Sequence, residues 1–255
     1  MEWVMLRAMQ TLRHKGSLGW LAWLLLVPIA SHAQERPIPR DILPGIGPQD
    51  PRRPVDARVM PFQALARVQH GLGGRCTGAL IAPNQVLTAA HCLIARRTEN
   101  LVQPGSVHVL LGYERGAQAA QAQVVSFRTG PGYRPGPGAP ADSDWAILTL
   151  ARDIAPRAAT LPLLNALPAP RTPLTLAGYQ QDRPEVLLAD TACRVLGVTS
   201  AGMLLHDCAG TRGVSGAPLL IAAPGGWAVA GVASRAAVET ATGLAVPAAT
   251  IAASR

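Results

Sequence analysis

Glycine and proline interrupt this sequence so often that long helices have little room to form. There are 25 glycines and 23 prolines among the 255 residues, spread along the chain without a three-residue repeat. Both residues destabilise helix interiors, which argues against a coiled coil or helical bundle, and the missing repeat excludes collagen. Hydrophobic residues make up 49% of the chain and charged residues 15%, so a disordered chain is excluded as well. We expect many short strands joined by turns, in one large β domain or two small ones.

The first 33 residues have the pattern of a cleaved secretory signal. Three basic residues precede an apolar run at 19–30, and Ser31 and Ala33 are the small residues of a signal-peptidase site. A helix rises about 1.5 Å per residue, so this run falls well short of a hydrocarbon core of roughly 30 Å. A cleaved signal is therefore favoured over a membrane anchor. We expect a mature chain from residue 34 that is secreted or periplasmic, with no membrane attachment after cleavage.

The formal net charge of +8 raises the question of a nucleic-acid partner. After residue 33 every basic residue is an arginine, because Lys15 is the only lysine. These arginines are scattered, with no run longer than the pairs at 52–53 and 96–97, and aromatic residues make up only 4% of the chain. We therefore expect a soluble arginine-bearing surface and no nucleic-acid partner.

Four cysteines lie in the mature part, at Cys76, Cys92, Cys193 and Cys208. An even number in a secreted chain favours disulfides. Three pairings are possible, and proximity along the chain favours Cys76–Cys92 and Cys193–Cys208. Loops of this length contribute about 3 kcal/mol each by restricting the unfolded chain. A zinc site is the alternative, but no C-x-x-C pair supports it, and we expect neither a metal nor a cofactor.

The remaining chain divides by its turn residues. Residues 34–60 are rich in proline and predict an extended strap or propeptide rather than a packed element. Strand-like runs lie at 63–69, 78–81, 85–88, 106–111, 121–127 and 145–150, and again at 173–177, 185–188, 193–196, 203–206, 218–221, 227–233 and 244–246. A loop is expected at 130–140, and a short helix at 248–254. This spacing predicts an all-β fold with two antiparallel six-stranded barrels, over 61–155 and 156–255.

Three segments carry residues suited to nucleophilic catalysis. The first runs from Cys76 to Cys92 and ends Thr-Ala-Ala-His91-Cys92; the second is Asp144 followed by an alternating strand; the third is Gly213-Val-Ser215-Gly-Ala-Pro218. They resemble the histidine, aspartate and serine blocks of chymotrypsin-like (trypsin-fold) serine proteases, in the same order, with spacings of 53 and 71 residues. The resemblance extends over about 59–246. It implies the chymotrypsin-like double barrel and a peptidase activity.

The chemistry of these residues agrees with that resemblance. A serine hydroxyl is a weak nucleophile that needs an adjacent base; His91 can accept its proton, and Asp144 would orient His91 and stabilise the imidazolium. The N–H groups of Gly213 and Ser215 could form an oxyanion hole, in which the loss of one donor costs about 3–4 kcal/mol of transition-state stabilisation. Asp142 competes for the acidic role, but the apolar strand directly follows Asp144.

Val214 departs from the trypsin pattern. Trypsin-type zymogens carry an aspartate there, which pairs with a newly freed N-terminal amine, and no R-I-V-G-G activation site is present either. We therefore predict that activation does not use this ion pair. The bacterial secreted glutamyl-endopeptidase branch also lacks the aspartate, and the hairpin between Cys193 and Cys208 resembles that branch.

By offset from the serine block, the substrate pocket should be formed by residues near 209–213 and 233–236: Ala209, Gly210, Thr211, Arg212, Ala233, Ser234 and Arg235. Trypsin-like pockets carry an acid where Ala209 stands, so cleavage after Lys or Arg is not indicated. Arg235 could favour an acidic side chain or could simply lie on the surface. His70, His108 and His206 are expected on the surface or in loops.

The sequence thus indicates a secreted, monomeric serine endopeptidase that acts on polypeptides. Two alternatives stay open: an inactive homologue that binds peptides, if Val214 leaves the oxyanion loop disordered, and an esterase on the same fold. An α/β-hydrolase is excluded because it needs a histidine after the serine, and none follows Ser215. A papain-like enzyme needs a free thiol, and the disulfide interpretation leaves none.

Overall fold

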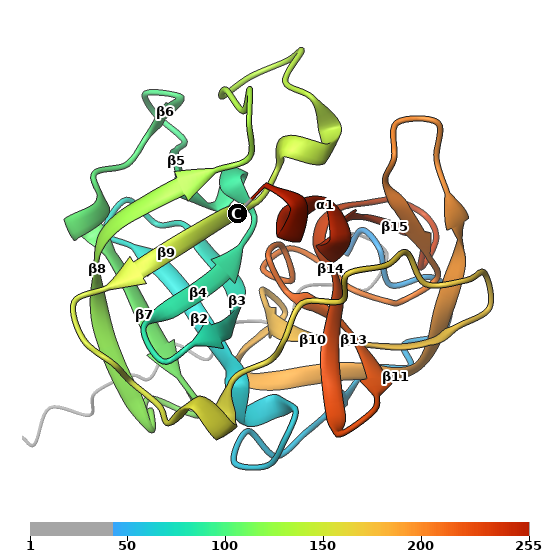
Figure 1. Ribbon diagram of the computed structural model, residues 1–255, viewed down its shortest axis with the longest axis horizontal. Coiled ribbons are helices and arrows are strands. Elements are labelled where there is room, and N and C mark those ends of the chain that lie inside the picture. Colours follow the sequence, from blue (N-terminus) through green and yellow to red (C-terminus); the bar gives the residue numbers. More distant parts are fainter. Residues whose placement is uncertain (1–42, 255) are drawn as a thin grey trace, which may run out of the picture. The chain divides into compact units, whose positions relative to one another are not determined.

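Strands dominate the structure, a computed structural model that describes residues 43–254 (Figure 1). The signal predicted at 1–33 lies outside the described residues. The strands are β1 (Arg53–Pro54), β2 (Leu65–His70), β3 (Arg75–Ala82), β4 (Gln85–Thr88), β5 (Ile94–Ala95), β6 (Asn100–Leu101), β7 (Val107–Leu111), β8 (Ala120–Thr129), β9 (Ala146–Leu150), β10 (Pro173–Gln180), β11 (Arg183–Val198), β12 (Leu204–His206), β13 (Pro218–Ala223), β14 (Gly226–Ala236) and β15 (Gly243–Pro247). The helix α1 spans Ala248–Ala253, and 3₁₀ helices span Phe62–Ala64, Ala90–Leu93, Pro104–Ser106, Ala141–Ser143 and Arg157–Ala159.

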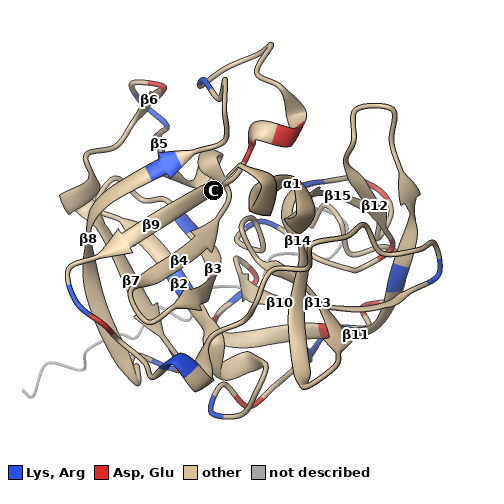
Figure 2. Cartoon of the chain, viewed as in Figure 1, with Lys and Arg blue, Asp and Glu red and all other residues tan. Residues whose placement is uncertain are grey.

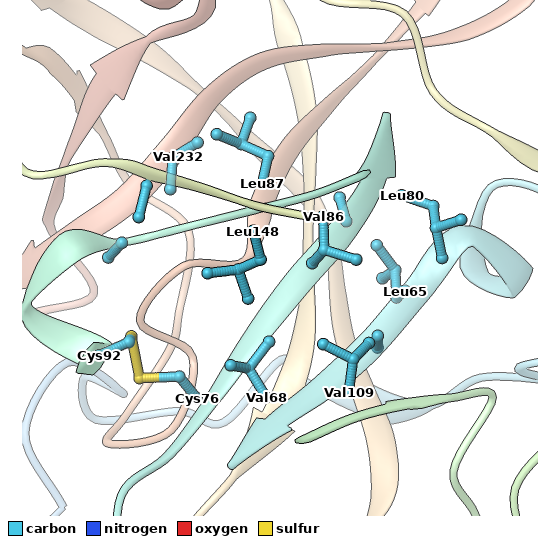
Figure 3. Close-up of a cluster of buried hydrophobic side chains, with 14 of the residues drawn as sticks. Leu65, Val68, Cys76, Leu80, Val86, Leu87, Cys92, Val109, Leu148 and Val232 are labelled. Atoms are coloured by element: carbon cyan, nitrogen blue, oxygen red, sulfur yellow. A yellow bond between two sulfur atoms is a disulfide. The ribbon is translucent and has the colours of Figure 1, made fainter. Parts of the chain in front are cut away.

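The first barrel is a closed antiparallel sheet in the order β2-β3-β4-β9-β8-β7. Its core is aliphatic because every second side chain of each strand points inward. Figure 3 shows part of this core, with Leu65, Val68, Leu80, Val86 and Leu148 in one buried cluster. The Cys76–Cys92 disulfide, with an S–S bond of 2.04 Å, lies at the edge of the cluster. The short pair β5–β6 was not predicted and forms its own two-stranded sheet.

The second barrel contains β11, β10, β13, β14, β15 and β12, and it closes where β12 pairs with β11. The two runs predicted at 185–188 and 193–196 form a single bent strand, β11, which has register shifts against both neighbours. The Cys193–Cys208 disulfide joins β11 to the segment after β12. The prediction of two six-stranded barrels followed by a short helix is therefore confirmed, and both disulfides favoured by proximity are present.

The buried side chains form two clusters. The larger one fills the first barrel and extends into the second, where Val232 of β14 and Ile251 of α1 belong to it. The smaller one lies around Cys193 and Cys208 and includes Val214. Charged residues are sparse along the ribbon (Figure 2). Within 43–254, no helix is long and apolar enough to cross a bilayer.

The proline-rich strap is packed against the second barrel from residue 43 onward, so the expectation of an unpacked segment is wrong for this part. Leu43 and Ile46 are buried, and β1 pairs with β11 at Arg53↔Ala189. Gly45 lies so close to the barrel, with φ +82°, that a Cβ there would be 2.2 Å from the carbonyl oxygen of Gly210. Proline content alone did not reveal these contacts, because they join residues far apart in the sequence.

Candidate active site

His91 lies in a tight turn between β4 and β5, the histidine turn (Ala89–Leu93). The backbone N–H of Cys92 donates to the Ala89 carbonyl over 3.2 Å, and the disulfide to Cys76 fixes the same point covalently. Ala89, Ala90 and Leu93 are fully buried, whereas the side chain of His91 is 35% exposed. The turn thus anchors its apolar residues in the first barrel and leaves the imidazole accessible.

Asp144 follows the 3₁₀ helix Ala141–Ser143 and precedes β9, which places its buried carboxylate against the histidine turn. Oδ1 accepts the His91 backbone N–H over 2.9 Å, and Oδ2 lies 2.8 Å from His91 Nδ1. The Ser234 hydroxyl also donates to Oδ2 over 2.5 Å. Burial alone would raise the pKa of Asp144, but the hydrogen bonds and charge of His91 and the Ser234 bond lower it below its usual value. The carboxylate therefore orients the imidazole with Nε2 directed away. Asp142 makes no side-chain hydrogen bond within the described residues.

Ser215 lies in the serine loop (Gly210–Ala217), which the first barrel contacts directly. The N–H of Thr77 donates to the Ser215 carbonyl over 2.9 Å, and the N–H of Gly216 donates to the Ala233 carbonyl over 2.8 Å. Gly216 fits closely against the strand that leads to His91, because a Cβ there would lie 2.8 Å from the nitrogen of Ala89. Ser215 is thereby held between the segment before His91 and the segment that carries Ser234.

Two N–H groups of the serine loop are free to receive an anion. The Arg212 carbonyl accepts the N–H of Gln181 over 2.7 Å, and the Val214 carbonyl accepts the N–H of Ala217 over 2.9 Å. In a trans peptide the C=O and the next N–H point in opposite directions, so the N–H groups of Gly213 and Ser215 point away from these partners. Neither N–H has an acceptor in the part of the chain that the structure describes. Gly213 has φ +95°, a conformation that suits glycine.

Val214 does not leave this loop without support. Its side chain is buried in the cluster around the Cys193–Cys208 disulfide. Its N–H donates to the Thr211 carbonyl over 3.0 Å, and the Thr77 hydroxyl donates to the Gly213 carbonyl over 2.9 Å. An apolar contact and neutral hydrogen bonds therefore stand where trypsin-type enzymes use an ion pair.

A buried ionic cluster connects the strap to the serine loop. The Gln180 Oε1 atom accepts both Arg52 Nη1, over 2.7 Å, and the N–H of Thr211, over 2.8 Å. The guanidinium of Arg52, 1% exposed, pairs with Asp50 over 2.9 Å and with Asp182 over 2.7 Å. Burial disfavours the charged forms of Asp50 and Arg52. Their mutual hydrogen bonds and charge nevertheless lower the pKa of Asp50 and raise that of Arg52. Sequence patterns missed this cluster because its members come from separate segments.

A cavity of about 190 Å³ opens beside Ser215. Six of the seven predicted pocket residues line it: Gly210, Thr211, Arg212, Ala233, Ser234 and Arg235. Ala209 does not; it is buried, and its N–H donates to Asp190 over 2.8 Å. The sequence missed Pro44, Leu176 and His206, which also line the cavity.

Two histidines expected at the surface are buried. His206 lies in β12, 2% exposed, and its Nδ1 accepts the N–H of Cys208 over 3.2 Å. Burial lowers the pKa of His206 to about 4, against a smaller opposite effect of Asp207. His70 ends β2 and is 6% exposed. These expectations were wrong because strand pairing, rather than side-chain polarity, decides burial here. His108 is exposed, although it lies in β7.

A second cavity, of about 300 Å³, lies under the loop predicted at 130–140. His91, Asp144 and Tyr133 line it together with Ser234 and Arg235, which it shares with the cavity beside Ser215. The two cavities therefore adjoin, with Ser215 in one and His91 in the other. Cys76, His91 and Cys92 also approach one another within 4.8 Å, but both sulfurs belong to the disulfide and are not metal donors in that form.

The double six-stranded barrel, in which a buried aspartate is paired with an accessible histidine, is the fold of chymotrypsin-like proteins. The chain belongs to the trypsin family, which it matches over residues 51–253.

Serine protease 56 is similar in sequence: the mouse protein is 31% identical over 185 residues, 63% of this chain and 30% of that protein. The human protein is 29% identical over 232 residues, 74% of this chain and 37% of that protein. The chain thus spans about a third of the length of these relatives. Among solved structures, a Glu endopeptidase in complex with MPD has a TM-score of 0.69 at 22% identity, over 81% of this chain and 96% of that one. Human heparin binding protein has a TM-score of 0.59 at 21% identity, over 78% and 92%.

Proposed function

We propose that this protein is a secreted serine endopeptidase with Ser215, His91 and Asp144 as its catalytic triad. The observation that carries the proposal is the pairing of two features. Asp144 holds His91 Nδ1 over 2.8 Å, and the loop that contains Ser215 presents the unpaired N–H groups of Gly213 and Ser215. A base oriented by a carboxylate, and donors placed for a developing oxyanion, are the two requirements of acyl transfer.

The proposed reaction has two stages. His91 Nε2 takes the proton of Ser215 Oγ as the oxygen attacks the scissile carbonyl, and the oxyanion accepts hydrogen bonds from the N–H groups of Gly213 and Ser215. Collapse of the intermediate expels the amine, which takes the proton from His91, and leaves an acyl-enzyme. Water then attacks the ester with His91 again as the base, which releases the acid and restores Ser215.

Support for activity, against a purely peptide-binding homologue, comes from the serine loop. The peptide-binding alternative requires that Val214 leave the oxyanion loop disordered. Instead, the side chain of Val214 is buried, and hydrogen bonds to the carbonyls of Thr211, Gly213 and Ser215 support the loop although it lacks the aspartate. Ester hydrolysis would use the same groups. A peptidase and an esterase can therefore be distinguished by the substrates they cleave and not by the residues of the site.

We further propose that the enzyme is related to the bacterial glutamyl-endopeptidase branch, which Val214 and the Cys193–Cys208 hairpin support; the Glu endopeptidase structure shares the fold. The proposal includes a signal at 1–33, a strap at 34–60 and barrels at 61–155 and 156–255. It also includes secretion or a periplasmic location, a monomeric state and the absence of membrane or nucleic-acid partners. No acidic residue lines the cavity beside Ser215, so we expect no preference for Lys or Arg before the cleaved bond. Arg235 at its mouth favours an acidic side chain there.

The decisive experiment compares the mature chain with Ser215→Ala, using Ser126→Ala in β8 as the matched control. We expect a fluorophosphonate to label the parent and the control but not Ser215→Ala. Unfolded casein should likewise be cleaved by the parent and the control but not by Ser215→Ala. If the parent neither takes label nor cleaves casein, the peptidase proposal fails. Cleavage of esters without cleavage of casein would favour the esterase, and residual cleavage by Ser215→Ala would show that the nucleophile is wrong.

A further inference from the structure

A third cavity borders the serine loop at Arg212 and Gly213. It has a volume of about 310 Å³ and is lined by residues of β2, β3 and their turn, the segment after β5, β10, β11 and their turn, and the serine loop: Arg67, Gly73, Arg75, Arg96, Tyr179, Gln180, Gln181, Pro184, Arg212 and Gly213. Four of these are arginines, and none is acidic. Such a concentration of positive charge in a concave site attracts anions.

Arg67 is the buried member of this group. It is 6% exposed and lies over the ring of Tyr113, with its guanidinium carbon 4.4 Å from the ring centroid. Its Nε and Nη1 atoms make no hydrogen bond within the described residues. The carboxylate nearest to it is Glu185, whose Oε1 is 3.6 Å from Nη1, while Oε2 accepts the Tyr113 hydroxyl and the side chain remains 51% exposed. A buried charge with so little compensation gains from an anionic ligand.

The position of the cavity relates it to the substrate. Arg212 lines both this cavity and the one beside Ser215; beyond it, the cavity beside Ser215 is lined by Ser234 and Arg235, and this one by Arg75 and Gln181. Under the proposed function, the segment before the scissile bond would lie along Ser234 and Arg235. The segment that leaves with the amine would then extend toward the arginine-lined cavity. The N–H of Thr77 donates to the Ser215 carbonyl, and Arg75 lies two residues before Thr77 in β3, in the same cavity as Arg96. Since an extended peptide advances about 3.3 Å per residue, we expect its first three positions after the cleaved bond to pass these arginines.

Resting on the proposed peptidase function, we propose that this cavity binds carboxylate side chains of the substrate on the leaving-group side of the cleaved bond. Guanidinium groups bind carboxylates through paired, charge-assisted hydrogen bonds. Arg75 and Arg96 are exposed, whereas Arg67 is buried. The exposed pair would therefore attract the carboxylate, and Arg67 would stabilise it once it is bound. The consequence is a preference for acidic residues in the first three positions after the cleaved bond.

Binding to intact Ser215→Ala protein tests this without requiring catalysis. Two fluorescent peptides, identical up to the scissile position, carry either Glu or Gln in the three positions after it. We expect the Glu peptide to bind at least tenfold more tightly at low salt, and the difference to shrink as salt rises. Adding Arg75→Gln or Arg96→Gln should reduce the difference. Adding Arg97→Gln, a neighbouring exposed arginine outside the cavity, should leave it unchanged.

Equal affinity for the two peptides, or an equal loss in Arg97→Gln, would overturn the proposal whatever the parent enzyme does with casein. Discrimination by Ser215→Ala combined with a parent that takes no fluorophosphonate would retain the carboxylate site and reject the peptidase. Displacement of both peptides alike by a sulfated polysaccharide, with no discrimination between them, would identify a general polyanion site and refute the substrate role.

Discussion

The histidine turn and the serine loop carry adjacent parts of one site but are held in different ways. The turn is fixed by its own residues, through a turn hydrogen bond and three buried apolar side chains, and by two partners: the disulfide to Cys76, 16 residues away, and the hydrogen bonds of His91 to Asp144. The loop is fixed from a distance, by Thr77 of the first barrel, Gln181 of the β10–β11 turn, Ala233 of β14 and Gly45 of the strap.

This difference teaches that the two halves of the site should respond differently to substitution. Changes outside the histidine turn, Cys76 and Asp144 should leave the turn intact, because its main contacts come from these residues. The serine loop instead depends on segments distributed over the whole chain, including Arg52, which acts on it through Gln180. We therefore predict that Arg52 is a positioning residue for the proposed oxyanion hole.

The largest expected effect tests the histidine turn. Asp144→Asn should lower kcat by about 10⁴-fold, because the amide no longer favours the tautomer that His91 needs as a base. Peptide hydrolysis at neutral pH measures this. Asp142→Asn, two residues earlier, should retain parental kcat, and an equal loss in both variants would show that the wrong carboxylate has been assigned.

Next comes the distant support of the serine loop. Arg52→Met removes a buried guanidinium and leaves Asp50 and Asp182 with Arg183 alone, 3.2 Å and 3.7 Å away. Unfolding in urea should therefore show a loss of about 3 kcal/mol, the lower end of the range for a broken buried ion pair. At temperatures where the variant is folded, kcat should fall while fluorophosphonate access to Ser215 remains. Arg53→Met removes an exposed neighbour and should change stability little. A parental kcat in folded Arg52→Met would refute the proposed coupling between the strap and the oxyanion hole.

The third prediction concerns pH and the segment that leads into the serine loop. Burial lowers the pKa of His206 to about 4, below the value of about 6.5 expected in the unfolded chain. The unfolded state therefore binds the proton more readily, and stability should be complete above pH 6.5 and decline as pH falls toward 4, by on the order of 3 kcal/mol in all.

Urea unfolding at stepped pH measures this decline. His206→Asn, which keeps an acceptor for the N–H of Cys208, should flatten it, whereas His108→Asn, at an exposed position, should preserve it. A parental profile in His206→Asn would assign the decline to other groups.

The smallest effect concerns the residue that joins the two regions. Thr77 follows Cys76, and its hydroxyl donates to the Gly213 carbonyl and accepts the N–H of Tyr179. Thr77→Val leaves both groups buried without partners and should cost about 1–3 kcal/mol of stability. Thermal unfolding measures this, with Thr98→Val at an exposed position as the control. Equal unfolding temperatures for the two variants would show that the Thr77 contact does not support the loop.

Local patterns in the sequence predicted most of the barrels, because alternation and turn residues act over a few positions. The resemblance to three sequence blocks led us to propose His91, Asp144 and Ser215, and proximity in sequence predicted the disulfide partners. The strap pairing, the Arg52 cluster and the burial of His206 escaped prediction. Arg52 and Asp182 are 130 positions apart, and nothing near either one signals its partner. The contacts that could not be predicted are thus those between residues far apart in the sequence.

The strap has a consequence for how the chain reaches its folded state. β1 precedes the first barrel in sequence but completes the edge of the second, and Arg128 of β8 in the first barrel donates to the Ser254 carbonyl beyond α1. Segments near both ends of the described chain are thus held by the barrel farther from them in sequence. Such pairings close long loops, whose entropy must be lost before the contacts form. The barrels are therefore not two autonomous folding units in series, and a single cut between them would leave each fragment without a segment that the other one carries.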